Sequence, residues 1–297
     1  MTNSAEIDEI DLLVDRARIA QEKFEKNGSQ ELFDLACQAV GWALMEPEQN
    51  QRLAELAVRE TGLGNVSDKI KKNHNKTLGL LRDIKDVKSF GHVSEDKKMG
   101  LNTYLRPKGV VAAIVPSTNP LATPVNNIIN ALKCGNSIIV APSPKGARPL
   151  KELLLLIHKN LSMIGLDQDL VQMVPVPPSK AKTNRLMQLA DMLVVTGSQN
   201  NVKAGYSSGT PALGVGQGNV VTIIDETADT QAAAKKIAIS KTFDNATSCS
   251  SENSVIAIEE VYDETVKFLS DEGGLLLNKD EADRLIDIHW KNGKMTT

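Results

Sequence analysis

The sequence predicts an α/β protein with a doubly wound parallel sheet, N-terminal helices and the start of a second α/β domain. Three observations favour this fold. Short runs of valine, isoleucine and leucine alternate with helical segments between residues 109 and 215. Residues 6–88 show helical periodicity, and the alternation of helix and strand resumes after residue 230. Near-continuous apolar strands separated by helices are typical of parallel sheets covered on both faces.

The composition indicates an ordinary soluble protein. The 297 residues are 41% hydrophobic and carry a formal net charge of -3, so no global charge attracts nucleic acid or anionic lipid. The longest apolar runs, such as ELLLLIH, are too short to span a bilayer, and the acidic N-terminus lacks a signal-peptide pattern. Three cysteines without a CxxC pair indicate no disulfide framework. We therefore expect a cytoplasmic protein without nucleic-acid or membrane partners.

The first helices are predicted from the spacing of apolar residues. Ile10, Val14 and Ala17 recur at three- and four-residue intervals and give one apolar stripe. Asn27 and Gly28 break the first helix, and Ser29 is the expected N-cap of the next.

The sheet is predicted from apolar runs that follow one another along the chain. The predicted strands are residues 109–116, 137–142, 170–176, 191–197 and 211–215. Helices are expected between them, through residues 126–133, 149–161 and 182–189. Such sheets bind ligands beyond the carboxyl ends of their strands, so the loops PSTNP, APSPKG and TGSQNN are the places to seek a site.

The domain boundary is expected late in the chain. Residues 1–235 should form a nucleotide-binding domain with its helical flank, and residues 236–297 the beginning of a catalytic domain. These roughly 60 residues are few for an independent domain. We expect that domain to continue beyond residue 297, and the chain expressed alone to be poorly soluble or loosely oligomeric, with slow turnover.

The three cysteines differ in their surroundings. Cys37 and Cys134 lie in apolar helical segments, where core packing is expected. Cys249 follows the polar run NATS and precedes two serines. A nucleophilic cysteine needs a polar, accessible site, but local sequence alone leaves both a packing role and a nucleophilic role open for Cys249.

Three other features have two readings each. TGSQNN suits a tight turn into a helix N-terminus, which could hold a phosphate or serve only as a turn. GVGQGN leaves the same two alternatives open, and it lacks the following helix of a GxGxxG motif. Asn119 could donate its amide to an oxyanion or cap the next helix. The four histidines occur singly, without metal-ligand spacing, and no metal site is expected.

Together, these motifs resemble the aldehyde dehydrogenase superfamily, with its Rossmann-type nucleotide domain. The closer resemblance is to the CoA-acylating branch, which includes acylating sulfoacetaldehyde dehydrogenases and the aldehyde dehydrogenase half of bifunctional alcohol/aldehyde dehydrogenases. The motifs occur in the family's order: GVVAAIVPSTNP, SIIVAPSPKGAR, TGSQNNVKAGYSSGTPALGVGQGN, IDETAD and SKTFDNATSCSSENSVI.

The resemblance implies a covalent reaction. Cys249 would attack an aldehyde, and Asn119 with the backbone N–H of Cys249 would hold the oxyanion. Hydride would pass to NADP or NAD, and coenzyme A, as co-substrate, would take the acyl group from the cysteine thioester. A short aldehyde, sulfoacetaldehyde or acetaldehyde, is the expected substrate. The full-length form is expected to be a homo-oligomer, a dimer or higher.

The resemblance also implies a set of cofactor-binding residues. They are Pro116, Ser117, Thr118, Pro142, Ser143, Lys145, Arg148, Thr196, Gly197, Ser198, Gly214, Val215 and Gly216. Lys145 and Arg148 follow the second strand without a neighbouring acid in the sequence. They could meet a 2′-phosphate, so NADP is at least as well supported as NAD.

One departure from the hydrolytic members bears on the reaction. Those members carry a glutamate base for water where this chain has Gly214, so a thioester should survive for coenzyme A. Glu252, three residues after Cys249, matches no base of the family and is expected to be structural. The alternative is a truncated, inactive dehydrogenase fragment or a non-catalytic partner.

Overall fold

The computed structural model describes residues 3–216, 218–291 and 294–295. The chain forms two compact units, residues 1–217 and residues 218–297. This division precedes the boundary expected after residue 235. The reason is pairing: β8 (Val220–Ile224) forms a parallel pair with β9 (Glu252–Ala257) in the second unit.

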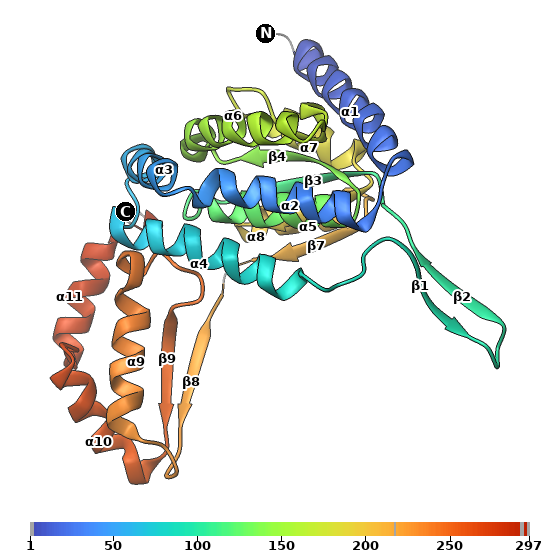
Figure 1. Cartoon of the computed structure of the whole chain (residues 1–297). Coiled ribbons are helices and arrows are strands. Elements are labelled where there is room, and N and C mark those ends of the chain that lie inside the picture. Colours follow the sequence, from blue (N-terminus) through green and yellow to red (C-terminus); the bar gives the residue numbers. More distant parts are fainter. Residues whose placement is uncertain (1–2, 217, 292–293, 296–297) are drawn as a thin grey trace. The chain divides into compact units, whose positions relative to one another are not determined.

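A five-stranded parallel sheet forms the centre of the first unit (Figure 1). Its spatial order is β5-β4-β3-β6-β7, so the doubly wound sheet predicted from the sequence is confirmed. The order reverses between β3 and β6, where the chain turns from one half of the sheet to the other. The strands are β3 (Val110–Val115), β4 (Ser137–Pro142), β5 (Val171–Met173), β6 (Met192–Thr196) and β7 (Ala212–Val215).

Helices cover both faces of this sheet. The strand β3 is apolar throughout because its side chains are buried on both faces. Val111, Ala113 and Val115 belong to one core, whereas the alternate residues of β3 belong to the other. The first core contains α2 (Gln30–Met45), α5 (Ala122–Lys133) and α6 (Ala147–Met163). The second contains α1 (Asn3–Lys26), α7 (Lys180–Leu189) and part of α8 (Gln199–Tyr206).

The predicted N-terminal helices are confirmed, and their boundaries follow from local chemistry. Ser29 caps α2 by accepting a hydrogen bond from the backbone N–H of Leu32 at 3.1 Å. The helix α3 (Pro47–Thr61) ends at Gly62, whose φ of +69° lies in the left-handed region that glycine adopts readily. The helix α4 (Val66–Ile84) follows and packs on α2, α3 and α5.

An antiparallel hairpin was not foreseen from the sequence. It consists of β1 (Gly91–Asp96) and β2 (Leu101–Leu105) and extends away from the sheet of the first unit (Figure 1). Every residue of β2 is exposed, so the hairpin has no buried face to produce the apolar alternation that identifies a strand.

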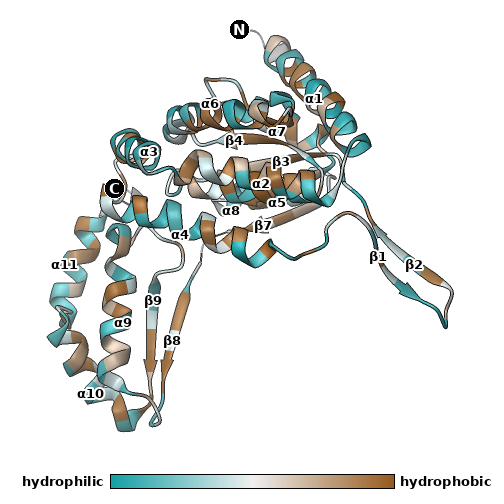
Figure 2. Cartoon of the chain, in the orientation of Figure 1, coloured by the Kyte–Doolittle hydropathy of each residue, from teal (hydrophilic) through white to brown (hydrophobic). Residues whose placement is uncertain are grey.

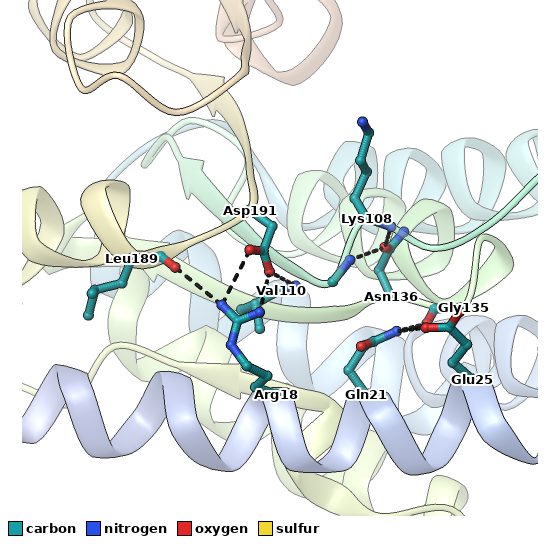
Figure 3. Close-up of polar contacts among 10 residues, drawn as sticks. Arg18, Gln21, Glu25, Lys108, Val110, Gly135, Asn136, Leu189 and Asp191 are labelled. Atoms are coloured by element: carbon teal, nitrogen blue, oxygen red, sulfur yellow. Dashed lines mark hydrogen bonds and ion pairs between the residues drawn. The ribbon is translucent and has the colours of Figure 1, made fainter.

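Polar contacts tie α1 to the amino ends of the central strands (Figure 3). Arg18 forms an ion pair with Asp191 at 2.9 Å, and the same carboxylate accepts a hydrogen bond from the N–H of Val110 at 2.8 Å. Asn136 accepts hydrogen bonds from the N–H groups of Lys108 and Gly109. This end of the sheet is therefore structurally filled, and the opposite, carboxyl end is available for ligands.

The second unit contains a short parallel sheet flanked by helices. Besides β8 and β9 it has α9 (Thr230–Thr242), α10 (Glu259–Asp271), α11 (Lys279–His289), β10 (Trp290–Lys291) and β11 (Lys294–Met295). Hydrophobic residues run along β8 (Figure 2). Ile223 of β8 and Ile256 of β9 are among the exposed apolar side chains of this unit. Three short 3-10 helices complete the described chain: η1 (Pro144–Gly146), η2 (Gln168–Leu170) and η3 (Phe243–Ala246).

No helix within the described residues has the length and hydropathy needed to cross a membrane.

Candidate active site

A cavity of about 620 Å³ lies at the carboxyl ends of β3, β4 and β6 in the first unit. Ligands of open α/β sheets bind at this edge, where the strand order reverses. Residues predicted to bind the cofactor line it from three loops: Pro116, Ser117, Pro142, Ser143, Thr196, Gly197 and Ser198. The loops chosen from the sequence thus meet at one cavity.

Local hydrogen bonds shape two of these loops. Ser198 caps α8, because its side chain accepts a hydrogen bond from the N–H of Asn201 at 3.3 Å. Ser143 accepts one from the N–H of Gly146 at 3.2 Å and opens η1. The N-terminus of α8 therefore opens at the cavity wall, where backbone N–H groups and the helix dipole favour an anion such as a phosphate.

The cavity has a second wall that the sequence did not reveal. It comes from α7 and the segment before it, through Pro178, Ser179, Lys180, Thr183, Asn184 and Met187. Ala204 of α8 also lines the cavity, next to Asn200 and Asn201 of the predicted TGSQNN segment. Position after a strand was the signal used to select the loops, and most of these residues lie within helices. Among the residues lining the cavity, Lys180 is the basic side chain.

The other predicted cofactor residues do not line this cavity: Thr118, Lys145, Arg148, Gly214, Val215 and Gly216. Lys145 is exposed on η1. Arg148 forms an ion pair with Glu60 of α3 at 2.8 Å. The sequence showed no acid next to Arg148, because Glu60 is distant along the chain and approaches only in the folded unit.

Gly214 is a packing position on β7. A Cβ atom there would lie 2.8 Å from Cγ1 of Val202 and 2.9 Å from the ring of Tyr206, both on α8. The Gly214 N–H donates a hydrogen bond to the Tyr206 hydroxyl at 3.0 Å. A side chain at this position would force the side chains of Val202 and Tyr206 to move.

Asn119 lies in the loop between β3 and α5 and is half-buried. The N-cap of α5 is Leu121, and no side chain caps that helix, so the alternative of Asn119 as a helix cap is wrong. The preceding carbonyl is held in place: Lys69 of α4, 3% exposed, donates a hydrogen bond to the Thr118 carbonyl at 3.4 Å. This contact limits movement of the loop that carries the Asn119 amide.

Cys249 lies in an exposed turn of the second unit, between η3 and β9. The chain reaches it through three successive non-glycine residues with left-handed φ angles, Asp244 (53°), Asn245 (53°) and Ala246 (60°). This conformation is costly for residues with a Cβ atom, and such strain tends to occur at functional sites. Thr247 stabilises the turn, because its hydroxyl donates to the Asp244 carboxylate at 2.8 Å.

A second chain segment approaches the backbone of Cys249. A Cβ atom on Gly218 would lie 2.9 Å from the Cys249 carbonyl oxygen, so only glycine allows this approach. Asn253 donates a hydrogen bond to the Gly218 carbonyl at 3.4 Å and accepts one from Lys241 at 3.1 Å. The last glycine of GVGQGN therefore supports the cysteine turn.

The other two cysteines are poor nucleophiles. Cys37 is 2% exposed and donates its S–H to the Ile129 carbonyl at 3.3 Å, as expected for core packing. Burial, with a smaller contribution from the Asp34 carboxylate, raises the pKa of Cys37 to about 12. The expected core position of Cys134 is wrong: this residue ends α5 and is exposed. Partial burial of its thiol still raises the pKa of Cys134.

Within the described part of the chain, no group of three or more histidine, cysteine, aspartate or glutamate residues could hold a metal ion. Glu252 begins β9, and its Oε2 is buried without a hydrogen-bond partner.

A doubly wound sheet with a cavity at its switch point defines the class of α/β proteins that bind ligands at the carboxyl edge of the sheet. The chain belongs to the aldehyde dehydrogenase family, which its residues 2–281 match. It is 54% identical to an acylating sulfoacetaldehyde dehydrogenase of Cupriavidus necator, over 95% of this chain and 57% of that protein. A second acylating sulfoacetaldehyde dehydrogenase, from Bilophila wadsworthia, is 43% identical over 89% of this chain and 56% of its own length.

Solved structures agree with this assignment. An acetylating aldehyde dehydrogenase of Geobacillus thermoglucosidasius, 34% identical, superposes with a TM-score of 0.92 over 99% of this chain and 65% of that chain. A propionaldehyde dehydrogenase of Rhodopseudomonas palustris, solved with bound CoA and an acylated cysteine, gives a TM-score of 0.83 at 30% identity, over 95% of this chain and 64% of that one. The chain thus spans less than two thirds of these relatives.

Proposed function

We propose that the protein is a CoA-acylating aldehyde dehydrogenase, which oxidises a short aldehyde to an acyl-CoA with NADP or NAD. Sulfoacetaldehyde is the first candidate substrate, because the relative with 54% identity is a sulfoacetaldehyde dehydrogenase. Acetaldehyde is the second, because the chain is also 36% identical to the bifunctional aldehyde-alcohol dehydrogenase of Escherichia coli. The cytoplasmic location and the homo-oligomer stay predictions.

Cys249 is the proposed nucleophile. Its thiolate forms a carbon–sulfur bond to the aldehyde carbon, and the carbonyl oxygen becomes an oxyanion. The Asn119 amide and the Cys249 N–H are the proposed donors to that oxygen. The nicotinamide ring, when bound, supplies the hydride acceptor. The thioester that remains on Cys249 is then attacked by the coenzyme A thiolate, which releases acyl-CoA and regenerates the Cys249 thiolate.

The packing of Gly214 is the observation that best supports acyl transfer to coenzyme A over hydrolysis. The hydrolytic members have a glutamate at this position, and here even a Cβ atom would overlap Val202 and Tyr206 of α8. Without a general base, water is poorly activated, and the thioester can persist until coenzyme A attacks it. The exposed turn of Cys249 is compatible with attack by a large thiol.

The cavity of the first unit fits a nicotinamide nucleotide. Its volume of about 620 Å³ is within the range of cofactor sites, and the N-terminus of α8 offers backbone N–H groups to a phosphate. Pro116, Ser117, Thr196 and Gly197 are the proposed contacts on the strand side. Thr118, Val215 and Gly216 stay predicted cofactor residues outside the cavity lining.

The contributions of Lys145 and Arg148 to binding the 2′-phosphate of NADP can be distinguished by mutation. Arg148 must share its charge with Glu60, whereas Lys145 is exposed. We expect Lys145→Ala to weaken NADP binding more than Arg148→Ala, with NAD binding spared in both variants. Fluorescence titration of each variant with NADPH and NADH measures this. Equal loss of both cofactors would remove these residues from 2′-phosphate recognition.

The overall proposal is tested by mixing the purified protein with an aldehyde panel, NADP or NAD, and coenzyme A. The reduced cofactor is followed by absorbance, and the product is identified by mass spectrometry. An acyl-CoA that forms only with coenzyme A present supports the proposal. A free carboxylic acid formed at the same rate without coenzyme A would identify a hydrolytic enzyme instead.

A further inference from the structure

We propose that Asn127 of α5 binds the anionic group at the far end of the aldehyde and so selects charged aldehydes over uncharged ones. This inference rests on the proposed function. For sulfoacetaldehyde the anionic group is a sulfonate, which one methylene separates from the aldehyde carbon.

The first observation is an unused hydrogen-bond donor. The Nδ2 atom of Asn127 is buried and has no hydrogen-bond partner. It is the one side-chain nitrogen with these properties among the residues that the structure describes. Buried donors are paired in nearly all proteins, and an exception needs an explanation such as a ligand. An amide NH2 has two hydrogens to donate, and a sulfonate has three oxygens to accept them.

The second observation is the place of Asn127 in the fold. The helix α5 begins at Ala122, directly after the loop that carries Asn119. A rise of 1.5 Å per residue places the Asn127 backbone about 7.5 Å along the axis from Ala122. Helical side chains lean toward the N-terminus of their helix, so we expect the Asn127 amide to extend back toward the loop of Asn119.

The third observation concerns the face of α5 on which Asn127 lies. Thr123 precedes it by four residues and therefore shares this face, and both residues are half-buried. The opposite face of α5 is apolar and packs in the core through Val125, Ile128 and Ile129. The half-buried, polar face of α5 thus runs from the Asn119 loop to Asn127. A short aldehyde with its oxygen at Asn119 could extend along this face.

The neighbouring residue Asn126 provides a matched control. Its buried atom without a partner is Oδ1, an acceptor, which would repel a sulfonate oxygen. The same substitution therefore removes an unpaired buried donor in one variant and an unpaired buried acceptor in the other. Leucine is suitable for both, because its side chain has the same number and branching of heavy atoms as asparagine and it favours helices.

The experiment compares sulfoacetaldehyde with propionaldehyde, in which a methyl group replaces the sulfonate. The ratio of kcat/KM for the two aldehydes is measured with coenzyme A and the preferred cofactor, for wild type, Asn127→Leu and Asn126→Leu. Loss of a hydrogen bond to a charged group should lower this ratio about 10- to 100-fold in Asn127→Leu. Inhibition by ethanesulfonate, competitive with the aldehyde, should weaken by a similar factor. Asn126→Leu should keep both values within about twofold of wild type.

The outcomes separate this inference from the function on which it rests. If wild type forms no acyl-CoA from either aldehyde, the proposed function fails. If wild type is active and Asn127→Leu leaves the ratio unchanged, or if Asn126→Leu lowers it equally, the assignment to Asn127 is wrong. Circular dichroism and NADPH binding confirm that each variant is folded.

Discussion

The three cysteines should react with an alkylating agent at very different rates. Iodoacetamide reacts with the thiolate rather than the thiol, so both the pKa and the exposure of each cysteine matter. Cys37 is buried with a pKa of about 12, which leaves roughly one thiol in 10⁴ ionised at pH 8. An ordinary free cysteine, with a pKa of about 8.5, is about one quarter ionised at the same pH. Ionisation alone therefore slows Cys37 by a factor of roughly 10³.

The expected order of labelling is Cys249 first, Cys134 second and Cys37 last. Cys134 is exposed, but its raised pKa reduces its thiolate fraction. Peptide mapping by mass spectrometry over a time course at pH 8 gives the three rates. We expect Cys249 to be labelled at least about 100-fold faster than Cys37. Labelling of Cys37 as fast as Cys249 would refute the reasoning from burial and pKa.

The same residues give the functional counterpart of this experiment. Cys249→Ala should abolish acyl-CoA formation. Cys134→Ala and Cys37→Ala should retain it, because neither thiol takes part in the proposed reaction. Thermal unfolding of each variant checks that a loss of activity is not a loss of fold, which matters most for the buried Cys37.

Three further predictions concern the oxyanion, the backbone and pH. Asn119→Ala should lower kcat about 10²–10³-fold with little change in NADPH binding, and a change within twofold would remove Asn119 from the reaction. Gly109→Ala should lower the free energy of unfolding, measured in urea, by at least about 3 kcal/mol. The reasons are the φ of +124° at Gly109 and the overlap of the new Cβ atom with the Asp191 carboxylate. Gly165→Ala, with a positive φ but open space, should cost less. Hydrogen bonding to Arg185 lowers the pKa of Asp11, so this stabilisation is present above about pH 4 and is lost as the pH falls further. The Tm difference between wild type and Asp11→Asn should therefore shrink steadily as the pH is lowered below about 4.

The sheet could be predicted from the sequence because burial on both faces requires apolar residues throughout its central strands. The cavity loops could be predicted for the same reason, since each follows a buried strand. The hairpin β1–β2 has no such apolar pattern, because its residues are largely exposed. The ion pair of Arg148 with Glu60 was also hidden, since it joins α6 to α3 across a long stretch of chain.

The candidate site was predictable where local chemistry dominates. Ser198 and the turn before α8 follow from a cap motif that spans four residues. The wall formed by α7 depends on how that helix packs beside the strand ends, which no local pattern encodes. Cys134 shows the converse error: its neighbours in sequence are apolar, but it ends its helix on an exposed face.

The central claim is that a thioester on Cys249 is transferred to coenzyme A. It is tested most directly by trapping: the protein is mixed with sulfoacetaldehyde and NADP or NAD without coenzyme A, and digested at low pH. Mass spectrometry should then find the acyl group on the Cys249 peptide, and addition of coenzyme A before digestion should move it into acyl-CoA. An unmodified Cys249 in protein that reduces the cofactor, or an acyl group that coenzyme A does not remove, would contradict the account.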